Sequence, residues 1–165
     1  MKPRHYAYVA ASLFIFILFW ISRYRLAKNS LELHQQIPTK SLSEISRLFD
    51  TDKGPGIHNY TPIYEPYFEP IRTRPIRFLE IGVFKGGSMK MWETYFPAAD
   101  LHFVDLTAVH MIYNMSSRST LHILDQSNQT ALNEFAAQIG QFDVIIDDGG
   151  HKMEEQIKTF EVQFQ

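Results

Sequence analysis

Residues 76–88 constrain the fold more than any other segment of the chain. An apolar run ends there in an acid, Glu80, and a glycine-rich turn follows it. Glycines directly after a parallel strand let the main chain turn sharply and approach a ligand where a Cβ atom would collide. A helix then starts over the ligand, and residues 89–95 predict such a helix. The segment therefore predicts a nucleotide-type cofactor site in an α/β domain.

Glu80 narrows the class of cofactor. A carboxylate beside a pyrophosphate would repel it, whereas a carboxylate beside a cationic group stabilises the bound ligand. S-adenosylmethionine carries cationic groups, so the acid favours that cofactor. The spacing of Gly82 and Gly86 does not make the G-x-G-x-x-G pattern, which argues against a nicotinamide oxidoreductase.

The pattern after Pro75 alternates short apolar runs with helical stretches. We expect strands at 76–81, 101–104, 121–124 and 142–146, and a last helix after two glycines at 149–150. This alternation predicts an α/β fold with a doubly wound, mostly parallel, Rossmann-like sheet of about four strands. Because the chain stops after the fourth strand, we expect the outer edge of that strand to be unpaired and the sheet to be incomplete.

The N-terminal part has a different composition. Residues 6–22 carry no charged side chain, and their length lies at the lower limit of a spanning helix, about 17 residues. Trp20, Arg23 and Arg25 stand where a signal-peptidase site needs small residues, which favours an uncleaved anchor over a cleaved signal. A buried helix would normally show a polar stripe. Positive charges on both flanks leave the orientation open. We predict a flank at 1–5, a transmembrane signal anchor at 6–22, a linker at 23–40 and the α/β domain at 41–165, hence a single-pass membrane protein.

Composition excludes several classes of function. Sixteen basic and 18 acidic residues leave a formal net charge of −2, without the basic excess of a nucleic-acid-binding protein. Cysteine is absent, which excludes disulfides, thiolate metal sites and a cysteine nucleophile. The 45% hydrophobic content predicts a packed core.

Acids or amides follow all four predicted strands. In an open parallel sheet the ligand lies beyond the carboxyl ends of the strands, so these side chains should converge on one crevice. Asp105 comes 25 residues after Glu80, close to the offset of about 20 residues at which an acid binds a ribose. A lone acid at such a position is often only a helix cap, and that alternative stays open for Asp125. The set comprises Glu80, Asp105, Asp125 with Gln126, and Asp147 with Asp148.

The motif at residues 147–151 adds two further predictions. Adjacent carboxylates such as Asp147 and Asp148 repel each other unless a cation or hydrogen-bond donors offset their charge, and Mg²⁺ accepts oxygen ligands of this kind. His151 follows two glycines at an expected helix N-terminus, where the local field favours the neutral imidazole that a general base requires. A histidine without chemistry at a helix start is the alternative. We expect the remaining histidines to be structural or surface residues; those considered are His34, His58, His102, His110 and His122.

These motifs together resemble the class I S-adenosylmethionine-dependent methyltransferases related to the macrolide-sugar O-methyltransferases of the mycinamicin and demethylmacrocin type. A leader segment before the sheet is also similar, and the resemblance covers about residues 41–165. The segments that carry it are Thr51-Asp52-Lys53-Gly54, Tyr60-Thr61-Pro62-Ile63-Tyr64-Glu65, Glu80-Ile81-Gly82-Val83, Gly86-Gly87-Ser88-Met89-Lys90-Met91-Trp92, Phe96-Pro97 and Asp147-Asp148-Gly149-Gly150-His151.

The resemblance implies roles for individual residues. It assigns the methionine part of the cofactor to Glu80, Gly82 and Ser88, the ribose to Asp105, and the adenine to Asp125 and Gln126, with Asp147 also counted as cofactor-binding. Asp148 would be a magnesium ligand, and His151 would take the proton from a sugar hydroxyl. The family's further metal ligands follow the next strand, which this chain lacks, so the resemblance implies a C-terminally truncated domain. The membrane anchor is a second departure from the soluble bacterial enzymes.

The favoured hypothesis is an S-adenosylmethionine-dependent O-methyltransferase-type domain that acts on a hydroxyl of a sugar or glycoside with metal assistance. Two alternatives stay open. One is a membrane-anchored, metal-dependent glycosyltransferase in which Asp147 and Asp148 hold a nucleotide sugar through a cation. The other is a catalytically inactive, truncated methyltransferase fragment. The sequence leaves the acceptor and the oligomeric state open.

Overall fold

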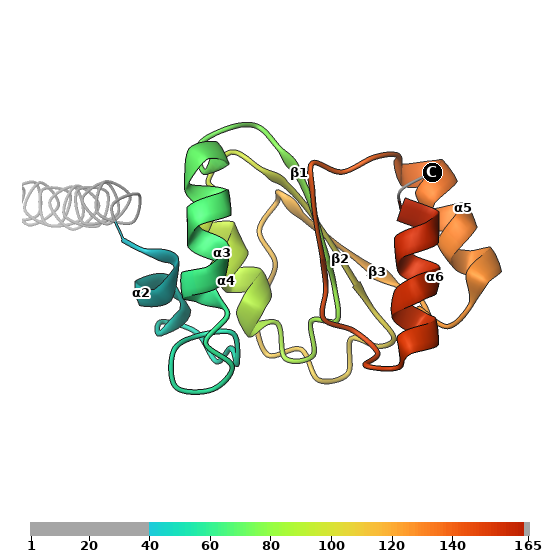
Figure 1. Cartoon of the computed structure of the whole chain (residues 1–165), viewed down its shortest axis with the longest axis horizontal. Helices are drawn as coiled ribbons and strands as arrows, with labels where there is room; N and C mark the ends of the chain where they lie inside the picture. The colour runs from blue at the N-terminus through green and yellow to red at the C-terminus, as the bar shows by residue number, and fades with distance from the viewer. Residues whose placement is uncertain (1–39, 164–165) are drawn as a thin grey trace, which may run out of the picture. The chain divides into compact units, whose positions relative to one another are not determined.

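A computed structural model of the chain describes residues 40–163 (Figure 1). The predicted flank at 1–5, the anchor at 6–22 and nearly all of the linker at 23–40 lie outside the described residues. Among the residues that are described, no helix is long and apolar enough to cross a membrane.

The described domain is built on a parallel sheet with the strand order β3-β2-β1-β4. Its strands are β1 (Arg77–Ile81), β2 (Asp100–Asp105), β3 (Ser119–Ile123) and β4 (Val144–Asp147). Within residues 40–163, β3 and β4 each pair with one neighbour and form the two edges. The predicted four-stranded parallel α/β sheet is therefore confirmed, with strand ends that shift by up to two residues.

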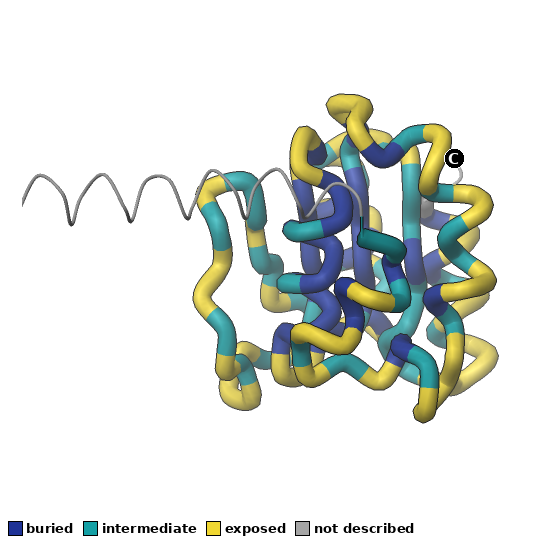
Figure 2. Tube along the Cα trace, turned by 90° about the vertical axis from the view of Figure 1, so that its left-hand side faces the viewer, coloured by how far each residue is buried: buried dark blue, intermediate teal, exposed yellow. Residues whose placement is uncertain are grey.

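Helices cover both faces of the sheet (Figure 1). On one face lie α2 (Leu42–Ser46), α3 (Thr61–Phe68) and α4 (Gly87–Tyr95), with a 3₁₀ turn, η2 (Glu69–Ile71), after α3. On the other face lie α5 (Gln129–Ile139) and α6 (Met153–Gln163). Buried positions concentrate in the strands and on the helix faces turned toward them, as Figure 2 shows.

The alternation of side chains along β1 divides the core into two layers. Phe78 packs with Trp92 and Phe96 on the α4 side, whereas Leu79 and Ile81 pack on the α5 side. Because successive strand residues point to opposite faces, Glu80 shares the α4 side with Phe78. Glu80, which was predicted to contact the cofactor, is therefore directed toward α4.

Two leader helices connect to this core. A capping box starts α2, since Ser41 Oγ accepts from the main chain of Glu44 and the Glu44 carboxylate accepts from the main chain of Ser41. The proline-rich aromatic segment forms α3 and packs Tyr64 and Phe68 against Trp92 of α4. This packing places the loop between α2 and α3 beside the sheet.

Candidate functional site

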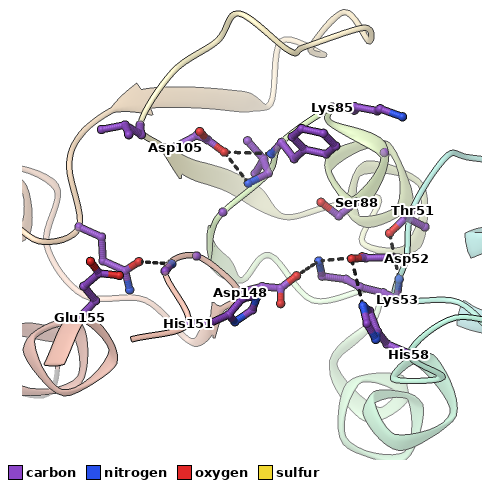
Figure 3. Close-up of a pocket in the computed structure, with 18 of the residues that line it drawn as sticks. Thr51, Asp52, Lys53, His58, Lys85, Ser88, Asp105, Asp148, His151 and Glu155 are labelled. Atoms are coloured by element: carbon purple, nitrogen blue, oxygen red, sulfur yellow. Dashed lines mark hydrogen bonds and ion pairs between the residues drawn. The ribbon is translucent and has the colours of Figure 1, made fainter. Parts of the chain in front are cut away.

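A cavity of about 760 Å³ opens at the carboxyl ends of the strands (Figure 3). Its wall comes from the segments that follow β1, β2, β3 and β4 and from the loop between α2 and α3, residues 50–60. This is the position at which open parallel sheets bind ligands, and the volume falls within the range of about 300–1,000 Å³ for small-molecule sites. Of the strand-end residues expected to converge on one crevice, the structure brings four to this lining, Asp105, Asp125, Gln126 and Asp148, whereas Glu80 and Asp147 are not part of it.

Acidic side chains dominate the lining of the cavity. Six carboxylates and two lysine ammonium groups line it, which leaves four uncompensated negative charges before any histidine is counted. Such a surplus attracts a ligand that carries positive charge and disfavours a polyphosphate. The acids are Asp50, Asp52, Asp105, Asp125, Asp148 and Glu155, and the lysines are Lys53 and Lys85.

The glycines of the turn after β1 bring main-chain segments together. Gly82 has a φ of 85°, and a Cβ atom on it would collide with the carbonyl oxygen of Asp148 and lie 2.6 Å from the Cα of Gly149. A Cβ atom on Gly87 would collide with the main chain of Asp50. We expected these glycines to allow close approach of a ligand, but at both positions the close neighbour is another part of the chain. They position the ends of β1, β4 and the leader loop around the cavity.

Asp105 holds this turn in place. One of its carboxylate oxygens, Oδ2, accepts from the amides of Val83 and Phe84 at 2.9 Å each, and Oδ1 accepts from the amide of Thr107 at 3.1 Å. Phe84 needs such support because its φ of 49° is uncommon for a residue with a bulky side chain. Asp105 lines the cavity, and its predicted contact with a ribose stays a prediction.

Glu80 lies beneath the cavity and does not form part of its lining among the described residues. The carboxylate is fully buried and accepts from Ser88 Oγ at 2.8 Å and from Trp92 Nε1 at 3.1 Å, and it lies 3.2 Å from Lys53 Nζ. Burial raises the pKa of Glu80, and the neighbouring ammonium opposes that rise. Ser88 and Gly82 do line the cavity. The cationic partner of Glu80 in this structure is thus a lysine of the chain.

Lys53 lies at this site, although no role of its own was predicted for it. It is 3% exposed, yet it lines the cavity, where it forms an ion pair with Asp148 (Figure 3). A second ion pair joins it to Glu80. Burial alone lowers the pKa of Lys53, but the two carboxylates raise it well above its ordinary value. The sequence offers one indication of a role for Lys53, its place in the motif at residues 51–54. Its partners Glu80 and Asp148 lie far away along the chain.

The two predicted adenine residues differ in their environments. Asp125 is exposed and lines the cavity. Hydrogen bonds from the side chain of Ser127 and from its amide, the latter at 2.8 Å, lower the pKa of Asp125. Gln126 is buried, and its amide nitrogen donates to Asp147 and to Thr159 of α6. Its carbonyl oxygen accepts from the amide of Gly150 at 2.8 Å. Gln126 therefore connects the end of β3 to the end of β4 and to α6 through hydrogen bonds.

The adjacent acids Asp147 and Asp148 have different partners. Asp147 accepts from Gln126 and is not part of the cavity lining, whereas Asp148 lines the cavity and pairs with Lys53. Consecutive residues at a strand end point to opposite sides, so the two carboxylates do not share one cation. Among residues 40–163, no three His, Asp or Glu side chains are placed to hold a metal ion.

Two histidines line the cavity. His151 is exposed, two residues before the start of α6, and its ring makes no hydrogen bond or ion pair within the described part of the chain. His58 was expected to be structural or on the surface, but it also lines the cavity, with Nε2 3.5 Å from Asp52 Oδ2. The site thus presents imidazole groups from both the leader loop and the segment after β4 (Figure 3).

No model of a known protein family matches the chain. Individual relatives do match. Mycinamicin VI 2''-O-methyltransferase of Micromonospora griseorubida is 33% identical over 117 residues, which cover 67% of this chain and 29% of that enzyme. Demethylmacrocin O-methyltransferase of Streptomyces fradiae is 32% identical over 125 residues, which cover 72% of this chain and 31% of that enzyme.

Solved structures give the same result. The MycE methyltransferase from the mycinamycin biosynthetic pathway, in complex with Mg, SAH and mycinamycin VI, matches with a TM-score of 0.68 and 31% identity. The match covers 76% of this chain and 36% of that structure. This chain therefore spans about a third of the length of its curated relatives. Over that third, the resemblance stated from the motifs is confirmed: the chain is homologous to the macrolide-sugar O-methyltransferases.

Proposed function

We propose that the described domain binds S-adenosylmethionine in the cavity at the strand ends and serves methyl transfer to a hydroxyl of a sugar or glycoside. The observation that carries this proposal is the acid-lined cavity at the carboxyl ends of β1, β2, β3 and β4. Homology to enzymes named as sugar O-methyltransferases supports the reaction class.

The residues of the cavity fit the cofactor. Its sulfonium and ammonium groups carry positive charge that the acid-rich lining would stabilise, and the turn at Gly82 and Ser88 borders the space that the ligand would fill. Asp105 keeps one carboxylate oxygen, Oδ1, with a single amide donor, so that oxygen retains a lone pair for a ribose hydroxyl. When bound, the cofactor supplies an activated methyl group on positively charged sulfur.

His151 is the proposed base. Its exposed imidazole would accept the hydroxyl proton as the oxygen forms its bond to the methyl carbon, while the bond between that carbon and sulfur breaks and a neutral thioether remains. The proton then passes to water, which reaches the exposed ring. Holding the hydroxyl in line with the methyl group would supply most of the rate enhancement.

The described residues do not by themselves fit a divalent metal ion. Asp148, the predicted magnesium ligand, is already paired with Lys53, and residues 40–163 hold no group of three ligating side chains. The name of one relative, 8-demethyl-8-alpha-L-rhamnosyl tetracenomycin-C 2'-O-methyltransferase of Streptomyces olivaceus, which is 34% identical over 116 residues, suggests a deoxysugar hydroxyl as the acceptor class.

The proposal is tested by isothermal titration of the full 165-residue chain with S-adenosylmethionine, S-adenosylhomocysteine and a uridine diphosphate sugar. We expect S-adenosylmethionine to bind, and Asp105→Asn to weaken that binding about tenfold, because hydrogen bonds to an ionised acceptor are about twice as strong as neutral ones. His151→Ala is the matched control from the same cavity and should change the affinity less than about twofold, about 0.4 kcal/mol.

Other outcomes would favour the alternatives. Binding of the nucleotide sugar with none of S-adenosylmethionine would favour the glycosyltransferase. Binding of neither would favour an inactive fragment. Loss of cofactor binding in His151→Ala would contradict the role of His151 as a base.

We also propose that the protein is a single-pass membrane protein. It rests on residues 6–22 of the sequence alone. Alkaline carbonate extraction of the full-length chain tests it, since an integral anchor resists extraction and a peripheral protein does not.

A further inference from the structure

The buried lysine Lys53 is a feature of the cavity that the proposed reaction does not use. Its nitrogen, Nζ, pairs with Asp148 Oδ2 and lies 3.8 Å from Asp52 Oδ1 (Figure 3). It also lies 3.2 Å from Glu80 Oε1. The side chain is 3% exposed and lines the cavity, so water screens its charge weakly. Lys53 therefore presents a positive charge within a lining that is otherwise rich in acids.

Lys53 is fixed at its main chain as well. Its carbonyl oxygen accepts from the amide of Tyr60 at 2.9 Å and from the amide of Thr61, the first residue of α3, at 3.1 Å. The turn that follows packs tightly, because a Cβ atom on Gly54 would lie 2.6 Å from Ser46 Oγ. The leader loop therefore holds the start of this side chain in place.

The ammonium group of Lys53 has a donor to spare. It carries three N–H groups. Asp148 accepts one of them, and Glu80 lies within hydrogen-bond distance of a second. Asp52, at 3.8 Å, lies beyond that distance. Within the described part of the chain, one N–H of Lys53 is thus left for a ligand in the cavity.

The proposed cofactor carries a group that needs such a donor. S-adenosylmethionine ends in an amino acid group, in which a carboxylate lies beside the ammonium. The acids of the lining suit the ammonium, but they repel the carboxylate. The turn after β1 offers it few amides, because those of Val83 and Phe84 donate to Asp105 and that of Gly86 donates to the carbonyl oxygen of Val83. A side-chain cation is therefore the favoured partner of the carboxylate.

Two lysines of the described lining could supply that cation, and they differ in burial. Lys85 is 45% exposed and lies 3.1 Å from Asp50 Oδ2, so water screens its charge and an ion pair there contributes little. Lys53 is nearly buried, and an interaction with its charge is screened much less. Burial thus favours Lys53 over Lys85.

We propose that Lys53 donates a hydrogen bond to the carboxylate of S-adenosylmethionine, while Asp52 and Asp148 beside it stabilise the ammonium of the same amino acid group. The inference rests on the proposed function, because it names a further binding residue for the same cofactor. The leader loop, and not only the strand ends, then contributes to recognition of the cofactor.

The test is a calorimetric titration of the full chain with S-adenosylmethionine and with decarboxylated S-adenosylmethionine, the same compound without the carboxylate. We expect Lys53→Gln to weaken binding of S-adenosylmethionine about tenfold, because hydrogen bonds between charged groups are about twice as strong as neutral ones. Binding of the decarboxylated compound should not weaken, since it has no carboxylate and the cavity becomes more negative. The ratio of the two affinities should therefore fall about tenfold.

Lys85→Gln is the matched control, because Lys85 lines the same cavity and carries the same charge. It should change the ratio of affinities less than about twofold. In case Lys53→Gln does not fold, the double variant Lys53→Gln with Glu80→Gln removes both charges of the buried pair and leaves no uncompensated buried charge. Glu80 is not part of the described lining, so the double variant should show the same fall of the ratio.

Two results would overturn the inference alone. One is equal weakening of both ligands in Lys53→Gln, which would show that Lys53 shapes the cavity without binding the carboxylate. The other is an equal change of the ratio in Lys53→Gln and Lys85→Gln, which would show a general effect of cavity charge. If the unmodified chain bound neither ligand, the proposed function would fail together with the inference.

Discussion

Replacing Gly82 by alanine is the sharpest test of how the site is built. The residue has a φ of 85°, which costs an L-residue roughly 1–2 kcal/mol. The new Cβ atom would also collide with the carbonyl oxygen of Asp148 and lie 2.6 Å from the Cα of Gly149, so the ends of β1 and β4 would have to separate. Overpacking of this kind costs about 1–3 kcal/mol. We expect Gly82→Ala to lower the free energy of unfolding by about 3 kcal/mol.

Gly56→Ala is the matched control for this prediction. Gly56 also has a positive φ, 104°, but nothing lies within 4 Å of a Cβ atom added to it. Gly56→Ala should cost only the strain of the main chain at a positive φ, about 1–2 kcal/mol. Urea unfolding of both variants, followed by circular dichroism, measures the difference. Costs equal to within about 0.5 kcal/mol would refute the argument that Gly82 is needed for close approach of two main-chain segments.

The remaining predictions concern polar contacts of the fold. Gln126→Leu should cost about 1–3 kcal/mol of unfolding free energy, because the carboxylate of Asp147 and the amide of Gly150 would lose their partner. Gln138→Leu on the exposed side of α5 is the control and should stay within about 0.5 kcal/mol; equal effects of the two variants in urea unfolding would contradict the bridging role of Gln126. Burial and the adjacent His102 lower the pKa of His122 in the folded chain. The imidazole of His122 is therefore protonated more readily in the unfolded chain than in the folded chain. The contribution of His122 is therefore complete above about pH 6.5 and falls as the pH drops below that value, by at most about 1.4 kcal/mol per pH unit. Thermal unfolding between pH 7.5 and 5.5 should show this loss, and a loss of the same size in His122→Gln would rule out His122 as its source.

Much of the fold could be predicted from local patterns. Strands alternate with helices, and both the order of the elements and the parallel sheet follow from that alternation. The segment that became α3 was not predicted as a helix, because Pro62 and Pro66 interrupt its pattern. Its helical form is supported by aromatic packing against Trp92, a residue 24 positions after the end of α3.

The candidate site was predicted in part, since four strand-end residues were correctly expected at one crevice. Asp105, Asp125, Gln126 and Asp148 all line the cavity. Glu80 belonged to the same set, but it faces α4. The pattern that locates a strand end does not tell which side of the sheet its last polar residue faces, because that depends on the register and on the helix that packs there.

The sequence by itself determined the class of fold, the edge of the sheet at which a ligand can bind and the resemblance to sugar O-methyltransferases. These features depend on short-range periodicity and on motifs of adjacent residues. Only the tertiary structure decided the charge balance of the site. Lys53 lies 27 residues before Glu80 and 95 before Asp148, and long-range packing alone brings the three charges together. For the same reason, the need for glycine at position 82 became visible only when the ends of β1 and β4 lay side by side.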